Sequence, residues 1–96
     1  MREPVVLPAA VRDIDQQAVY YRDQGSPDTA TRRLERTRRT FEFAADNPGL
    51  GAMIGPGLRV WRIERFEHHN MVYRTMDERT EIIRVLHGAS DLDLLL

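Results

Sequence analysis

The sequence predicts an α+β fold in which a hairpin of two helices packs on a small antiparallel sheet. Apolar residues recur with helical spacing in the first half of the chain and with a period of two in the second half. Helices followed by consecutive hairpin strands are typical of α+β proteins, because the helices can then cover one face of the sheet. With 96 residues the chain is expected to form a single domain over residues 1–96.

The first helix is expected to begin at Pro8 and to end before Gly25. Residues 5–7 can form only a short strand, because prolines stand on both sides of them. Proline suits the first turn of a helix, where its missing N–H would have no partner. A single apolar stripe follows at steps of three, four and three, through Val11, Ile14, Ala18 and Tyr21.

The second helix is expected to begin at Pro27, with Ser26 as its N-cap and Asp28 near the positive end of the helix dipole. It should end where residues 47–49, Asn-Pro-Gly, interrupt the pattern. Because the link between the two helices is short, they should form an antiparallel hairpin. The apolar stripe of this helix runs through Ala30, Leu34, Thr37, Phe41 and Ala44 or Ala45.

Three strands are expected after an irregular, glycine-rich connection at residues 51–57. They span residues 58–66, 71–75 and 80–87, with turns at 67–70 and 76–79. The last strand has apolar residues on both pleat faces, which predicts a position in the interior of the sheet. Gly88 then permits a sharp exit of the chain.

The composition is that of an ordinary globular domain. The chain has no cysteine, which excludes disulfides and thiolate metal sites. No apolar run approaches the roughly 20 residues of a membrane helix, and the N-terminus is too short and too interrupted for a signal peptide, so we expect a cytoplasmic protein that does not enter a membrane. All 14 basic residues are arginine, but the net charge of −1 does not favour direct, nonspecific binding of nucleic acid.

Candidate catalytic and metal-binding residues are few. The histidines at 68, 69 and 87 have no acidic ligand at a suitable spacing, so neither a metal nor another cofactor is expected. His87 is interpreted as a hydrogen-bonding residue at a strand end or, alternatively, as a general base. The arginine-rich run at 32–39 is either a solvated helix face or a contact for an acidic partner. Two interpretations also apply to the arginines of the expected strands. They either form a cluster on an open sheet face that binds RNA phosphates or antitoxin carboxylates, or they are scattered at the edge of the sheet. These residues are Arg59, Arg62, Arg65, Arg74 and Arg84.

The segment near the C-terminus carries a family resemblance. Residues 84–89, Arg-Val-Leu-His-Gly-Ala, followed by Asp91, resemble the closing motif of the ParE branch of the RelE/ParE toxins from bacterial toxin–antitoxin pairs. Residues 10–21 resemble the first helix of these toxins, and residues 41–51 (Phe-x-x-Ala-Ala-Asp-Asn-Pro-Gly-x-Gly) resemble the end of the second helix and the following loop. The strand pair is similar at Gly57-Leu58-Arg59-x-Trp61, Phe66 and Met71-Val72-Tyr73-Arg74. The resemblance therefore covers nearly the whole chain.

The resemblance implies a function in binding. ParE-like toxins act on DNA gyrase by binding, without turnover, and a cognate ParD-like antitoxin neutralises them. A toxin of this type is not an enzyme. In this chain the target contact is expected at Arg59, Arg84, His87, Leu92 and Leu94, and Ser90 departs from the family pattern because the ParE branch usually has arginine there.

Two alternatives remain open. The first is a ribosome-dependent mRNA endonuclease of RelE type that uses Arg59, Arg65, Arg84 and His87. Asn70 appears in place of one RelE-type arginine and no tyrosine follows Tyr73, so the groups that phosphodiester cleavage requires are depleted. The second is a non-toxic module that binds an antitoxin only.

Surplus apolar residues predict where the antitoxin binds. An extended or helical segment is expected to cross the helix hairpin and the sheet and to become ordered on binding. The four leucines at the end of the chain either cover the sheet or contact the target. The expected antitoxin contacts are Val11, Ile14, Tyr20, Tyr21 and Met71.

Overall fold

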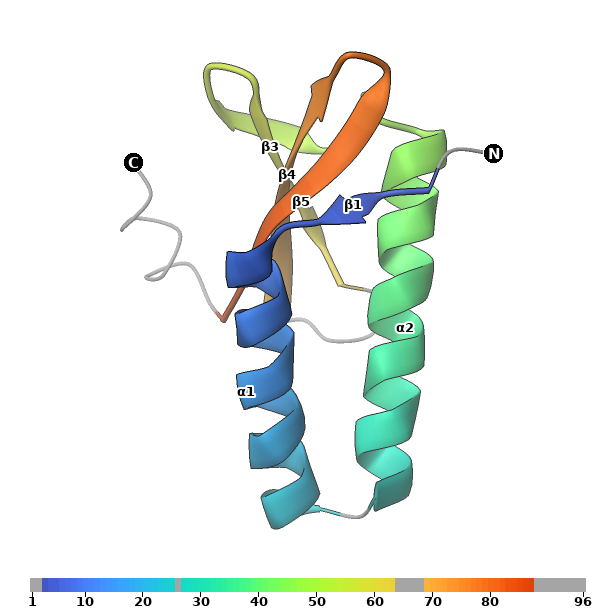
Figure 1. The fold of residues 1–96 in the computed structure, drawn as a ribbon, viewed down its shortest axis with the longest axis vertical. Helices are drawn as coiled ribbons and strands as arrows, with labels where there is room; N and C mark the ends of the chain where they lie inside the picture. The colour runs from blue at the N-terminus through green and yellow to red at the C-terminus, as the bar shows by residue number, and fades with distance from the viewer. Residues whose placement is uncertain (1–2, 26, 64–68, 88–96) are drawn as a thin grey trace.

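A computed structural model of the protein describes residues 3–25, 27–63 and 69–87, with the side chains of Tyr21 and Gln24 left out. Helices α1 (Pro8–Gln24) and α2 (Pro27–Asp46) lie antiparallel as a hairpin against a five-stranded sheet (Figure 1). The predicted α+β fold class is therefore confirmed. The strands are β1 (Val5–Val6), β2 (Ala52–Gly55), β3 (Leu58–Arg62), β4 (His69–Met76) and β5 (Arg79–His87).

The sheet has the strand order β1-β5-β4-β3-β2. Strands β2 to β5 form an antiparallel meander, and β1 adds a parallel pair at the edge next to β5. Strand β5 thus lies inside the sheet, between β1 and β4, as its apolar residues predicted. Its register shifts once, because Val72 pairs with Arg84 and Tyr73 with Ile82, so Ile83 is the extra residue of a bulge.

The helix starts at Pro8 and Pro27 agree with the sequence prediction, and α2 ends at Asp46, directly before the Asn-Pro-Gly sequence. Two strand predictions were wrong. The connection at residues 51–57 contains β2, which pairs with β3 through a register shift between Met53 and Gly55 and therefore shows no regular alternation. Strand β4 begins at His69, because His69 and Asn70 pair with β5 although their polarity suggested a turn.

The main core lies between the helix hairpin and the sheet. From the sheet it includes Tyr73, Met71, Ile82 and Val85, all 2% exposed or less. The helices contribute Ala10, Phe41 and Ala44. Small alanine side chains let the helix backbones approach the sheet closely, so that the larger strand residues fill the space between the layers.

Helix α1 completes the edge of β5 where β1 ends. The short strand β1 pairs only with Glu81 and Ile82, and the N–H of Leu7 donates to the carbonyl of Ile82 at 2.9 Å. Farther along β5, Asp13 Oδ2 accepts the Val85 N–H at 3.0 Å and Gln17 Nε2 donates to the Val85 carbonyl at 3.0 Å. Asp13 and Gln17 are one helical turn apart, so one face of α1 supplies both the acceptor and the donor that a neighbouring strand would supply.

The same two side chains connect the helices to the sheet. The Asp13 carboxylate accepts two hydrogen bonds from the Arg84 guanidinium, at 2.7 Å from Nε and 3.0 Å from Nη2. Gln17 Oε1 accepts a hydrogen bond from Nη2 of the buried Arg33 on α2 at 3.1 Å. The bidentate, charge-assisted contact between Asp13 and Arg84 fixes orientation as well as distance. Together the contacts of Asp13 and Gln17 link α1, α2 and β5 through one polar network.

We predict that Asp13→Ala lowers the free energy of unfolding by about 2–4 kcal/mol, because it leaves the Val85 N–H and the Arg84 guanidinium without their shared acceptor. Urea denaturation would measure the loss. Asp15→Ala is the matched control, since Asp15 is exposed on the same helix and should change stability by only about 0.5 kcal/mol. Equal losses in the two variants would contradict the role given to Asp13.

Glu81 is a buried carboxylate in the β4–β5 hairpin. Arg74 Nε donates to Oε1 at 2.7 Å, and Arg79 Nη2 donates to Oε2 at 2.7 Å. The hydrogen bond from Arg74, supported by Arg79, lowers the pKa of Glu81 below its ordinary value of 4.5, although burial acts in the opposite direction. A lowered pKa in the folded state means that the ionised carboxylate stabilises the fold above the ordinary pKa and that this stabilisation is lost as the pH falls through the lowered pKa.

We therefore predict that the stability of the protein decreases as the pH falls below about 4.5, and that Glu81 causes part of this decrease. Glu81→Gln should be less stable than the wild type at neutral pH and should depend less on pH in the acid range. Urea denaturation between pH 3 and 7 would measure both (the interval brackets the ordinary carboxyl pKa of about 4). Parallel pH profiles of the two proteins would count against the assignment.

Candidate functional site

The residues expected to contact an antitoxin do not form one surface. Val11 and Tyr20 are exposed, with 43% and 58% of their surface accessible. They stand nine positions apart on α1, a rotation of about 180°, so they lie on opposite sides of the helix. Ile14 packs partly against the core, and the side chain of Tyr21 lies outside the described residues. The prediction for Met71 was wrong, because this side chain points into the core and is fully buried.

The arginines expected to contact the target have internal partners. Arg59 Nη1 donates to the carbonyl of Gly51 at 2.6 Å and to that of Gly49 at 3.3 Å, and Arg84 binds Asp13. His87 is exposed at the end of β5, with its ring edge against His69 at a centroid distance of 4.7 Å. The other expected residues, Leu92 and Leu94, lie outside the described residues, as do Arg65 and Ser90.

The loop between α2 and β2 is held by the core residue Tyr73. Its hydroxyl donates to the carbonyl of Pro48 at 3.1 Å and accepts the Gly51 N–H at 2.8 Å. Arg59 binds the same loop from β3. Two strands, β4 through Tyr73 and β3 through Arg59, therefore hold this loop in place. Arg59 thus has a structural role that the sequence did not reveal.

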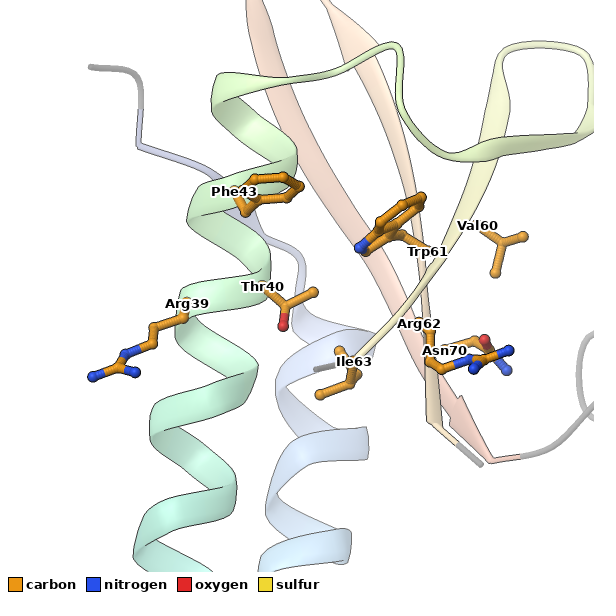
Figure 2. Close-up of a pocket in the computed structure, with 8 residues that line it drawn as sticks. All are labelled: Arg39, Thr40, Phe43, Val60, Trp61, Arg62, Ile63 and Asn70. Atoms are coloured by element: carbon orange, nitrogen blue, oxygen red, sulfur yellow. The ribbon is translucent and has the colours of Figure 1, made fainter. Parts of the chain in front are cut away.

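An open groove of about 790 Å³ lies between α2 and β3. Figure 2 shows Phe43 and Thr40 extending from α2 toward Trp61, which extends from β3 toward the helix. Ile63 follows Trp61 on the same side of the chain (Figure 2). We call this cavity the α2–β3 groove; its described lining residues are Arg39, Thr40, Phe43, Val60, Trp61, Arg62, Ile63 and Asn70.

The α2–β3 groove exists because α2 and β2 both leave this part of β3 uncovered. Helix α2 packs on α1 and β5. Strand β2 pairs with β3 only from Leu58 to Val60, so Trp61 lies beyond the paired region. Phe43 remains 49% exposed as a result. The sequence contained a signal for this, since Phe43 is two positions after Phe41 and therefore lies off the apolar stripe that packs on the core.

A second, smaller cavity of about 410 Å³ lies beside α1 at the ends of β4 and β5. Its described lining is polar and aromatic and consists of Gln16, Gln17, Tyr20, His69 and His87. Within the described part of the chain, no group of three or more histidine or acidic side chains is placed to hold a metal ion. Likewise, neither described helix is long and apolar enough to cross a membrane.

Comparison with known proteins agrees with this architecture. The chain belongs to the family of ParE toxins of type II toxin–antitoxin systems (parDE), whose family model matches residues 5–92. A solved chain of the chromosomal ParDE toxin–antitoxin system from P. aeruginosa has the same fold, with a TM-score of 0.79 and 20% sequence identity over 92% of this chain and 97% of that chain. No curated protein matches the sequence. The resemblance stated from the sequence is thereby confirmed at the level of family and fold.

The close contact between Tyr73 and the loop that joins α2 to β2 can be tested by substitution at Gly51. A Cβ added at Gly51 would lie 2.6 Å from the Tyr73 hydroxyl and 2.8 Å from the carbonyl oxygen of Val60, whereas a Cβ at Gly49 would meet nothing within 4 Å. We predict that Gly51→Ala lowers the unfolding free energy by about 1–3 kcal/mol through overpacking. Gly49→Ala, the control, should stay within about 1 kcal/mol of the wild type. Thermal denaturation of both variants would decide, and equal effects would contradict the close contact.

Proposed function

We propose that this protein is a ParE-type toxin that inhibits DNA gyrase by binding and that a cognate ParD-like antitoxin neutralises it. The observation that carries the proposal is the family match over residues 5–92. The open apolar α2–β3 groove supports it, because exposed apolar area on so small a fold is typical of a protein with a macromolecular partner. We further propose that the protein acts in the cytoplasm, where gyrase is found.

The internal contacts of the arginines favour binding over nuclease activity. Cleavage of RNA requires positive charge and a proton acceptor that converge on one phosphate. Arg84 instead forms a bidentate pair with Asp13, and Arg59 binds the carbonyls of the loop at residues 48–51. We therefore propose that the protein is not an enzyme, and we keep ribosome-dependent mRNA cleavage as the competing function.

Three assays separate the candidate functions. Induced expression with and without the adjacent antitoxin gene tests for toxicity and for its neutralisation. Supercoiling by purified gyrase, in the presence of the purified toxin, tests the proposed target. Cleavage of mRNA on programmed ribosomes tests the competing function. Inhibition of supercoiling that the antitoxin relieves would support the proposal, whereas mRNA cleavage without inhibition would contradict it. A protein that binds the antitoxin but inhibits neither process would be a non-toxic binding module.

The C-terminal leucines provide a prediction about the target contact, although Leu92 to Leu96 lie outside the described residues. We predict that deleting these five residues leaves a folded protein that binds the antitoxin but inhibits gyrase less. The reason is that ParE-like toxins use their C-terminal segment for toxicity, and that burying a leucine side chain against a partner contributes about 1.5–3 kcal/mol.

Three measurements on the truncated chain distinguish the possibilities. An unchanged melting temperature and unchanged antitoxin affinity, together with reduced inhibition of supercoiling, would support a role of the leucines in the target contact. Loss of the folded state would mean that the leucines belong to the core. Full inhibition by a folded truncation would show that the segment has no role in binding gyrase.

A further inference from the structure

We propose that His69 and His87 bind a divalent transition-metal ion such as zinc, in the cavity of about 410 Å³ beside α1 at the ends of β4 and β5. Each strand supplies one imidazole nitrogen, and water completes the coordination. This inference goes beyond the proposed toxin activity and does not depend on it. It also departs from the expectation drawn from the sequence, in which the pairing of these two histidines was not visible.

The backbone places the two histidines directly opposite each other on neighbouring strands. His69 and His87 are partners at the end of the β4–β5 ladder. The carbonyl of His69 accepts the Ile63 N–H at 2.9 Å, so the backbone groups of His69 face β3 and not β5. His69 and His87 therefore form a non-hydrogen-bonded pair, because both backbone groups of a strand residue point to the same side. In such a pair the Cα atoms are only about 4.5 Å apart and the side chains lie close together.

Both imidazoles lie on the sheet face that the helices cover. Side chains two positions apart on a strand share a face. Met71 and Val85, which are two positions from His69 and His87, belong to the main core. His69 is only 4% exposed, whereas His87 is exposed. The pair thus stands at the open end of the core, where an ion from solvent can reach it.

The geometry of the two rings suits ligands of one ion. Their centroids are 4.7 Å apart, and the ring planes are inclined at 66°. An imidazole nitrogen binds zinc at about 2.0–2.1 Å, which places the ion about 3.2 Å from the ring centre. Two rings at that distance have centroids 4.7 Å apart when the angle at the ion is about 95°. This angle lies between the octahedral and tetrahedral values. Rotation about the terminal histidine torsion is soft, so a ring can turn a nitrogen toward the ion without moving the backbone.

The surroundings of the two rings are polar and already fixed in place. Gln17 lines the cavity and is held by two hydrogen bonds, from its Nε2 to the Val85 carbonyl and from Arg33 to its Oε1. Helix α1 is therefore fixed beside the histidines. A histidine that binds a metal through one nitrogen commonly donates a hydrogen bond from the other, which orients the ring. Other contacts of the two imidazoles are thus compatible with metal binding.

The ligand set determines which ion can bind and how tightly. Imidazole suits zinc, nickel and copper, whereas magnesium and calcium require oxygen ligands. The chain has no cysteine, so histidine is its best ligand for a transition metal. Two imidazoles are fewer than the four protein ligands of a structural zinc site, and none of the described lining residues is acidic. The site should therefore bind zinc more weakly than a structural zinc site does.

The test titrates the purified protein, without an affinity tag, with zinc chloride or nickel chloride in a calorimeter, and with magnesium chloride as the negative probe. His87→Gln removes the exposed ligand and leaves the buried His69 in place, so the fold should be retained. His68→Gln is the matched control, because His68 is the third histidine of the chain and lies outside the described residues. Melting temperatures without metal verify that each variant is folded.

We expect one zinc ion per chain and no binding of magnesium. His87→Gln should bind zinc at least about tenfold more weakly, and His68→Gln should stay within about twofold of the wild type. Zinc should raise the melting temperature of the wild type but not that of His87→Gln, because an ion that binds the folded state stabilises it. Binding should weaken at acid pH, since protons compete for the imidazole nitrogens.

Ring signals in NMR spectra of the wild type identify the ligands independently of any substitution. Zinc should shift the imidazole signals of His69 and His87 together and leave those of His68 unchanged. The proposal is wrong if zinc does not bind, or if His68→Gln abolishes binding while His87→Gln retains it; the paired rings then only fill the end of the core. Half an ion per chain, with dimers in sedimentation, would also overturn it, because the ion would then bridge two chains. The supercoiling assay tests the proposed function separately, so the two can fail independently.

Discussion

The structure depends on how the exposed edge of β5 is completed. A buried backbone N–H or carbonyl without a partner is costly, so each must find one. The strand β1 has only two residues and therefore covers only the first part of β5. Asp13 and Gln17 then bind the N–H and the carbonyl of Val85. Helix α1 thus supplies the hydrogen-bond partners that a longer edge strand would otherwise supply to β5. It does so with two side chains that are one helical turn apart.

This arrangement also determines where the α2–β3 groove lies. Because α1 must lie along β5, and because Gln17 binds Arg33 of α2, the whole hairpin is held over the β5 side of the sheet. Helix α2 consequently stands apart from β3, and the α2–β3 groove remains between them. The exposed Phe43 and the half-buried Trp61 of the groove then follow from how the sheet edge is completed on the opposite side of the molecule. The position of the helix hairpin over the β5 side of the sheet therefore accounts both for the polar network at β5 and for the apolar groove beside β3.

The sequence predicted the features that local rules control. The helices begin at their prolines and end at the Asn-Pro-Gly sequence because capping and backbone restrictions act over a few residues. Features that require a distant partner were missed: the pairing of His69 with His87, the burial of Met71 and the bond between Asp13 and Arg84, which are 71 positions apart. Arg84 interrupts the apolar residues of β5, but its partner on α1 could not be predicted from the residues next to it in the sequence. The α2–β3 groove could likewise be predicted only in part. The position of Phe43 off the core-facing stripe follows from the helical period, whereas the gap between α2 and β3 does not.

Native-state amide hydrogen exchange at Val85 tests this account most directly. In the wild type the Val85 amide should exchange as slowly as the amides in the middle of β4, such as that of Val72, and only through global unfolding. In Asp13→Ala the Val85 amide should exchange by a local opening, many times faster relative to Val72 than in the wild type. Rapid exchange of the Val85 amide in the wild type, or an unchanged ratio in the variant, would contradict the claim that α1 completes the edge of the sheet.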